Sequence, residues 1–153
     1  MRAVIQRVKS ASVTVGTQVT GEIEKGLLVL IGVCAEDTQE DIDKLAKKIT
    51  SLRLWPDDKG AQWKKSVQDI QGKVLCVSQF TLFGRISKGT KPDFHEAAGG
   101  EFALSTYNQT KLAIASRMPN GTHDIQDGSF GAMMDVALVN DGPVTIQYDT
   151  KSK

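Results

Sequence analysis

The sequence has few of the residues on which several common kinds of active site depend. It contains two histidines and two cysteines, and neither cysteine belongs to a CxxC pair. The zinc motif HExxH and the dinucleotide-binding motif GxGxxG are both missing. These absences argue against metal and nucleotide sites of the usual kinds, and we expect the protein to use no metal and no cofactor.

Neither an excess of one charge nor a long apolar run is present. The 19 Lys and Arg residues nearly balance the 18 Asp and Glu residues, so an RNA partner must be bound by a local basic patch. The longest apolar run, 27–35, is too short to span a membrane, and the alternating start, 1–7, is unlike a signal peptide. Cys34 and Cys76 lie in apolar runs, as buried thiols of a reducing compartment do. We expect a cytoplasmic protein with no membrane partner.

The length and the apolar patterns favour a single domain, 1–153, because 40% apolar residues in a chain of this length suffice for one core. Apolar and polar residues alternate over 3–8, 11–15 and 19–23, which predicts a β-meander. The continuous apolar stretch 26–33 is typical of a strand that is covered on both faces. We expect it to be the central strand.

One helix is clearly indicated after Thr38, which can cap its N-terminus. Its apolar residues recur at helical spacing, at Ile42, Leu45, Ala46, Ile49 and Leu52. Farther along, 73–79 is predicted to be a strand and 101–117 a second helix. The segments 132–139 and 144–148 read as a hairpin around the turn residues between them. The predicted fold class is α+β, mostly antiparallel strands with two packed helices.

Polar residues end the strand predicted over 73–79, in the run Ser78, Gln79, Phe80, Thr81. A strand that turns here can direct backbone N–H groups outward, and such groups can stabilise an oxyanion without help from a side chain. The alternative is that a strand merely meets solvent at this point.

Another interpretation makes Ser78 or Thr81 a nucleophile with a histidine base. The sequence does not favour it, because there is no GxSxG motif and because His95 and His123 lie in loop-like segments without a recognisable partner. A hydroxyl without an activating base is a poor nucleophile at neutral pH. We therefore interpret Ser78 and Thr81 as positioning groups.

Gly142 and Pro143 form a dipeptide that is usually an ordinary turn. An X-Pro bond can be cis, however, and glycine before it allows backbone geometries that are closed to other residues. A rigid turn of this kind can hold two carbonyl oxygens in fixed directions. These oxygens would repel a substituent that points at them, and so distinguish enantiomers without any side chain.

Several basic residues lie in the loops that we expect to flank the end of this strand, namely Lys64, Lys65, Arg85, Lys88 and Lys91. They can form a local surface for phosphate groups, or they can simply be solvated charges.

Two runs of the sequence match the signature motifs of a known family, namely 78–82 (SQFTL) and 140–145 (NDGPVT). The segments 5–8, 26–32 and 130–139 also fit its pattern. The chain thus resembles the D-aminoacyl-tRNA deacylases over nearly its whole length. The resemblance implies a barrel-like core, a homodimer and no cofactor.

The family hydrolyses the ester that joins a D-amino acid to the 3′-terminal adenosine of tRNA, and achiral glycine passes the same filter. By resemblance, Ser78, Gln79, Phe80 and Thr81 line the pocket, and N–H groups near Phe80 and Thr81 receive the carbonyl oxygen. The 2′-hydroxyl of the tRNA would assist the attacking water, which fits the missing general base.

Chiral selection is implied for the second motif. The Gly142–Pro143 turn of one subunit would be a cis peptide inserted into the active site of the other subunit. Arg7 would brace this turn, and Asn140 belongs to the same group of residues. Of the basic residues, Arg85, Lys88 and Lys91 are the candidates for tRNA contact.

The chain departs from the family pattern at Lys91, where relatives often have arginine, so the contact with tRNA would be a point charge instead of a planar fork. The run 78–81 is that of the strict deacylases and not the Pro-Gln-Ala-Thr of a cousin group with relaxed chirality. The alternative function is a non-catalytic nucleic-acid-binding module with a role in DNA replication. Its duplex-DNA binding would survive replacement of Gln79 or Thr81.

Overall fold

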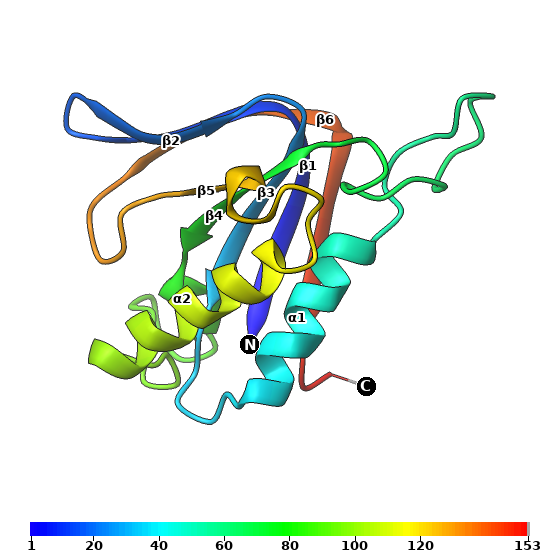
Figure 1. The fold of residues 1–153 in the computed structure, drawn as a ribbon. Helices are drawn as coiled ribbons and strands as arrows, with labels where there is room; N and C mark the ends of the chain where they lie inside the picture. The colour runs from blue at the N-terminus through cyan, green and yellow to red at the C-terminus, as the bar shows by residue number, and fades with distance from the viewer. Residues whose placement is uncertain (153) are drawn as a thin grey trace.

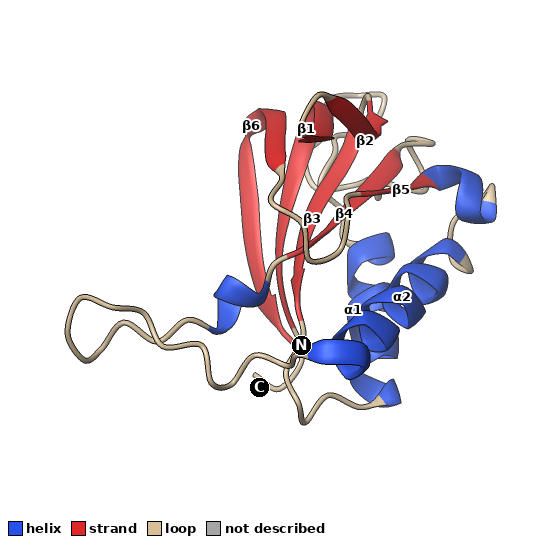
Figure 2. Ribbon diagram, turned by 90° about the vertical axis from the view of Figure 1, so that its left-hand side faces the viewer, coloured by secondary structure: helices blue, strands red, loops and turns tan. Residues whose placement is uncertain are grey.

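The computed structural model describes residues 1–152 and has a six-stranded sheet with two helices packed on one face (Figures 1 and 2). The strands are β1 (Arg2–Val15), β2 (Gln18–Ile23), β3 (Gly26–Gly32), β4 (Lys73–Ser78), β5 (Ile125–Asp127) and β6 (Asp135–Asp149). The helices are α1 (Gln39–Ser51) and α2 (Gly100–Ala115), with 3-10 turns at η1 (Phe80–Phe83) and η2 (Gly121–Asp124). Within residues 1–152, no helix combines the length and the apolar character needed to cross a membrane.

The sheet has the order β2-β1-β3-β4-β5, and β6 also pairs with β1. The predicted meander is therefore wrong, because the two predicted strands 3–8 and 11–15 form one long strand, β1. Its first half pairs with β3 and its second half with β2. The sheet is mostly antiparallel, as predicted, but it also contains the parallel pairs β3–β4 and β4–β5. Parallel neighbours need long crossovers, and α1 and α2 lie in these two connections.

The predicted hairpin at 132–148 is also wrong, because β6 runs through it as a single strand. Both halves of β6 pair with β1 in the antiparallel sense. The turn-forming residues make a bulge instead. Val8 is paired with Asn140 and Gln6 with Thr145, so the β6 segment between these two pairs is longer than the β1 segment opposite it. The extra residues project from the sheet, and the strand then continues in the same direction.

The sheet curls until its two edges approach each other, which gives a nearly closed barrel. The approach is closest where β2 meets β5, because a Cβ atom on Gly21 would lie 2.3 Å from the carbonyl oxygen of Asp127. Glycine is needed here for lack of space. The barrel-like α+β core with two helices was correctly predicted.

The core has two parts, one on each face of β3 and β4. Between the sheet and the helices lie Ile5, Leu27, Val29, Ile31, Leu45, Ile49, Val74, Tyr107 and Ile114. Inside the curl lie Val8, Val13, Leu28, Leu75 and Val77. Burial on both faces explains the continuous apolar stretch of β3, and β3 is the central strand as predicted.

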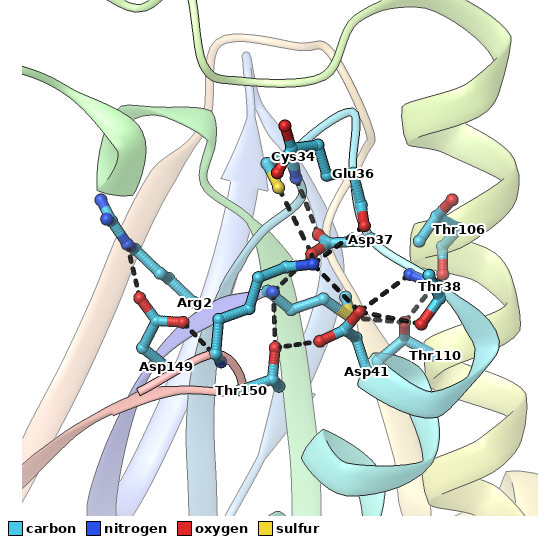
Figure 3. Close-up of polar contacts among 12 residues, drawn as sticks. Arg2, Cys34, Glu36, Asp37, Thr38, Asp41, Thr106, Thr110, Asp149 and Thr150 are labelled. Atoms are coloured by element: carbon cyan, nitrogen blue, oxygen red, sulfur yellow. Dashed lines mark hydrogen bonds and ion pairs between the residues drawn. The ribbon is translucent and has the colours of Figure 1, made fainter. Parts of the chain in front are cut away.

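A buried polar network ties the two ends of the described chain together (Figure 3). The α-ammonium of Met1 donates to Asp37 Oδ1 at 2.6 Å and to Thr150 Oγ1 at 2.8 Å. Thr150 in turn donates to Asp41 in the first turn of α1 at 2.6 Å. Asp41 also accepts from the backbone N–H of Thr38, which confirms Thr38 as the cap of this helix.

Candidate active site

Ser78, Gln79, Phe80 and Thr81 lie where β4 ends and η1 begins. The N–H of Gln79 donates to the carbonyl oxygen of Ile31 at 2.7 Å, so sheet pairing continues one residue beyond β4. The chain then turns tightly over β3. This is possible because Gly32 has no side chain, since a Cβ there would lie 3.0 Å from the carbonyl oxygen of Gln79.

These four residues line a cavity of about 760 Å³. Its other walls are the start of α2, the loop before it, and the segment 130–134. Phe80 is half exposed at the cavity and stacks edge-on against Phe94, with 5.1 Å between the ring centroids. The structure brings the four residues of the 78–81 run together at one cavity, whereas the sequence did not identify Phe94, Tyr107 or 130–134 as cavity residues.

The cavity wall offers main-chain groups rather than charged side chains. Among its described lining residues there is no His, Asp, Glu, Lys, Arg or Cys. The amide N–H groups of Phe80 and Thr81 begin η1, where a helix has no internal acceptors, and no hydrogen bond is described for either of them. Such N–H groups can receive a developing oxyanion. The side chain of Gln79 donates to Thr81 Oγ1 and holds that hydroxyl.

Neither histidine lies in the cavity wall. His95 contacts Asp93 in the exposed loop that follows η1, and His123 lies in η2. In the part of the chain that the structure describes, no three His, Cys, Asp or Glu side chains are grouped as metal ligands would be.

The Gly142–Pro143 peptide is cis, and Gly142 has a φ of 121°. Arg7 holds the turn, with Nε donating to the carbonyl oxygen of Asp141 at 3.2 Å and lying 3.3 Å from its carboxylate. Asn140 Nδ2 donates across the bulge to the carbonyl oxygens of Arg7 (2.9 Å) and Val144 (3.1 Å). Gly142 and Pro143 themselves are exposed.

Within one chain, this turn and the cavity lie far apart. In the sheet, Ser78 is paired with Ile31, and Ile31 is paired with Ala3 of β1. The turn instead lies beside Arg7, farther along β1. Four residues of strand separate Ala3 from Arg7, which is about 13 Å. None of Arg7, Asn140, Gly142 and Pro143 lines the cavity.

The basic residues predicted to contact tRNA divide between two loops. Arg85, Lys88 and Lys91 lie in the loop after η1, which Figure 2 shows extending away on the side opposite the helices. Arg85 is paired with Glu96, while Lys88 and Lys91 are exposed. Lys64 and Lys65 do not flank Thr81 as predicted. Their backbone N–H groups donate to the carbonyl oxygen of Trp55, and the carbonyl oxygen of the adjacent Leu54 accepts a hydrogen bond from Arg7.

The sequence matches the family described as D-Tyr-tRNA(Tyr) deacylase over residues 4–149. The chain belongs to this family. A D-aminoacyl-tRNA deacylase of Yarrowia lipolytica is 60% identical over 99% of both chains. That of Saccharomyces cerevisiae is 43% identical over 98% of this chain and 99% of its own.

Solved structures agree with the family fold. The structure of a protein named c-Myc DNA Unwinding Element Binding Protein is 45% identical, with a TM-score of 0.93 over 99% of this chain and 100% of its own. Another, of a probable eukaryotic D-amino acid tRNA deacylase, has a TM-score of 0.81 over 96% of this chain and 97% of its own. At 15% identity, it supports the fold alone.

Proposed function

We propose that this protein hydrolyses the ester bond between a D-amino acid and the 3′-terminal adenosine of tRNA, releasing both. One observation carries the proposal: in a member of the deacylase family, the 78–81 motif forms the wall of a cavity whose polar groups are backbone amides and neutral side chains. Such a wall suits the binding of a neutral ester carbonyl.

The chemistry follows from this wall. The N–H groups of Phe80 and Thr81 stabilise the negative charge that develops on the carbonyl oxygen as water attacks. Ser78 and Thr81 position the substrate, because no ionisable partner in the described cavity wall activates either hydroxyl. The 2′-hydroxyl of the terminal adenosine assists the attacking water in place of a protein base.

Chiral selection comes from a second subunit. The Gly142–Pro143 turn is exposed and braced by Arg7 and Asn140, yet it lies away from the cavity of its own chain. In a homodimer, the turn of one subunit enters the cavity of the other, where its carbonyl oxygens repel the side chain of an L-amino acid. Glycine has no side chain to repel and is accepted.

The deacylase activity is tested with purified protein and tRNA charged with D-tyrosine, L-tyrosine or glycine. We expect rapid release of D-tyrosine and glycine, and release of L-tyrosine at the uncatalysed rate. Equal rates for the two tyrosine enantiomers, or no release of either, would overturn the proposal.

The shared site is tested by complementation between two defective variants. Phe80→Pro removes one amide donor from the cavity. Gly142→Ala places a Cβ 2.9 Å from Val144 Cγ2 and 3.0 Å from Arg7 Nη2 at a φ that suits glycine, so it distorts the turn. Each variant alone should be poorly active or unselective, whereas co-expressed, differently tagged subunits should regain one intact site. A fully active monomer in sedimentation, or no recovery in mixed dimers, would contradict the shared site.

The second candidate function is a non-catalytic nucleic-acid-binding module. It is favoured by the 45% identical solved structure, because the name of that protein refers to binding of a DNA element. The net charge of +1 argues against strong duplex binding, because most of that affinity comes from phosphate neutralisation. Duplex binding that survives Thr81→Val, together with no ester cleavage by the unmodified protein, would favour this candidate.

A further inference from the structure

Tyr107 of α2 is a cavity residue whose hydroxyl is turned away from the 78–81 run and bound elsewhere. It is 1% exposed, and its hydroxyl donates to Asp127 Oδ1 at 2.6 Å. Lys111, one turn farther along α2, pairs with the other carboxylate oxygen and lies over the ring of Tyr107. Two residues of α2 thus bind the two oxygens of the Asp127 carboxylate. The backbone of Asp127 is fixed in the sheet by its pairing with Cys76 of β4.

The segment Ser129–Met134 follows Asp127 directly and forms a wall of the same cavity. It is neither helix nor strand, and a turn is closed within it by the hydrogen bond from the N–H of Ala132 to the carbonyl oxygen of Ser129 at 3.1 Å. The N–H of Gly128 donates to the carbonyl oxygen of Cys76 at 3.1 Å, and the N–H of Ser129 contacts the sulfur of Met134 at 3.3 Å. At the end of the segment, Met134 packs against the core inside the curl. Near its start, the ring of Tyr107 packs against Phe130 with 5.6 Å between centroids.

We propose that Tyr107 is a positioning residue of the proposed active site: clamped by Asp127 and Lys111, its ring fixes Phe130 and thereby the segment Ser129–Met134 against the substrate. The inference rests on the proposed deacylase function for its effect on rate. The clamp joins α2, β5 and the segment. Because residues 130–134 line the same cavity as Phe80 and Thr81, a loosely held segment would change the shape of that cavity.

Tyr107 acts through this packing and not as an acid or base. Burial, with smaller contributions from Cys76 and Asp127, raises the pKa of Tyr107 far above its ordinary value. The hydroxyl therefore stays protonated throughout the physiological range. It is a permanent donor to Asp127, as a clamp requires.

The activity test compares Tyr107→Phe, which loses only the hydroxyl, with Tyr107→Leu, which also loses the ring. The control is Tyr148→Phe, the same change at a half-buried tyrosine in β6 for which no hydrogen bond is described. Assays use D-tyrosyl-tRNA at a temperature at which melting curves show every variant folded. We expect kcat to fall about threefold for Phe and at least about tenfold for Leu, because small displacements of a positioned group are costly.

The KM for tRNA should stay within about twofold, since phosphate contacts outside the cavity dominate tRNA binding. A purely structural role would leave kcat of the folded variants unchanged. If the unmodified enzyme is active and both Tyr107 variants keep its kcat, the inference is overturned.

A second measurement separates this inference from the deacylase proposal. In methyl-labelled methionine NMR spectra, Met133 and Met134 report on the segment, and Met118, which follows the C-terminal end of α2, serves as reference. Tyr107→Leu should shift or broaden Met133 and Met134 more than Met118, whether or not the protein cleaves any ester. Unchanged Met133 and Met134 signals would overturn the positioning role, even in an active deacylase.

Discussion

The buried network at the chain ends and the cavity wall differ in how completely their polar groups are paired. Asp37 and Asp41 both have charged or hydrogen-bonding partners in Figure 3, and the α-ammonium of Met1 is fully buried against Asp37. In the cavity wall, by contrast, the amides of Phe80 and Thr81 make no described hydrogen bond. Paired buried charges stabilise one conformation, whereas free donors can still bind a ligand. The buried charges therefore contribute to stability, whereas the amides of Phe80 and Thr81 remain available for the proposed chemistry.

Breaking the paired region should give the largest effect on stability. Asp37→Ala leaves the buried ammonium with Thr150 as its only other hydrogen-bond acceptor and removes the acceptor of the Cys34 N–H, so we expect the free energy of unfolding to fall by about 3 kcal/mol. Urea denaturation measures this change. Asp43→Ala, an exposed carboxylate on α1, should cost less than about 0.5 kcal/mol. Equal losses of unfolding free energy in the two variants would show that the buried network stabilises the fold no more than an exposed carboxylate does.

Removing an unpaired amide from the cavity wall should instead lower activity and leave the fold intact. Proline is tolerated at the first position of a helix, so Phe80→Pro at the start of η1 removes the amide donor with little strain. Phe80→Ala loses the same ring but keeps the N–H. We expect kcat of the proline variant to be about 100-fold below that of the alanine variant, as for loss of one oxyanion donor. Equal kcat values would exclude this amide from the reaction.

The fold was predictable where the signal is local. The cap at Thr38 and the apolar spacing predicted α1, and the unbroken apolar run predicted β3. The errors have a common cause. Asn140 to Pro143 contains turn residues, but whether the chain reverses or bulges there depends on β1, which pairs with both sides of the bulge. Pairing between distant segments leaves no trace in local composition.

The candidate site divides in the same way. The 78–81 run and the Gly142–Pro143 dipeptide could be proposed from the sequence because each is a compact motif. Tyr107 gave no signal, because its partner Asp127 lies twenty residues farther along the chain and the two meet only in the fold. Nor did local sequence patterns indicate that the two motifs lie at different levels of the sheet within one chain.

The paired region should also set the response to acid. Burial alone would raise the pKa of Asp41, but hydrogen bonds from Thr150 and Thr38 outweigh it and lower this pKa well below its ordinary value. A lowered pKa stabilises the fold above the unfolded-state pKa of about 3.9, and this contribution is lost as the pH falls below it. We expect Asp41→Asn to reduce stability at pH 7 and to flatten its dependence on pH between about 4 and 2. Thermal melts across this pH range measure the change, and an unchanged dependence of stability on pH would show that Asp41 does not set the response to acid.

The smallest effects should come from the loop after η1, where charge is neither buried nor part of the cavity. Lys88 and Lys91 are exposed, so each is free to contact a phosphate of the tRNA, whereas Arg85 is already paired with Glu96. Replacing either lysine by alanine should raise KM about two- to threefold, leave kcat unchanged and reduce the salt dependence of binding by about one phosphate contact. Arg85→Ala should do less to KM, because its guanidinium is already paired with Glu96 and is not available to a phosphate. A larger effect from Arg85 than from the lysines would mean that the ion pair opens to bind tRNA, and that even the paired charges of this loop serve the substrate.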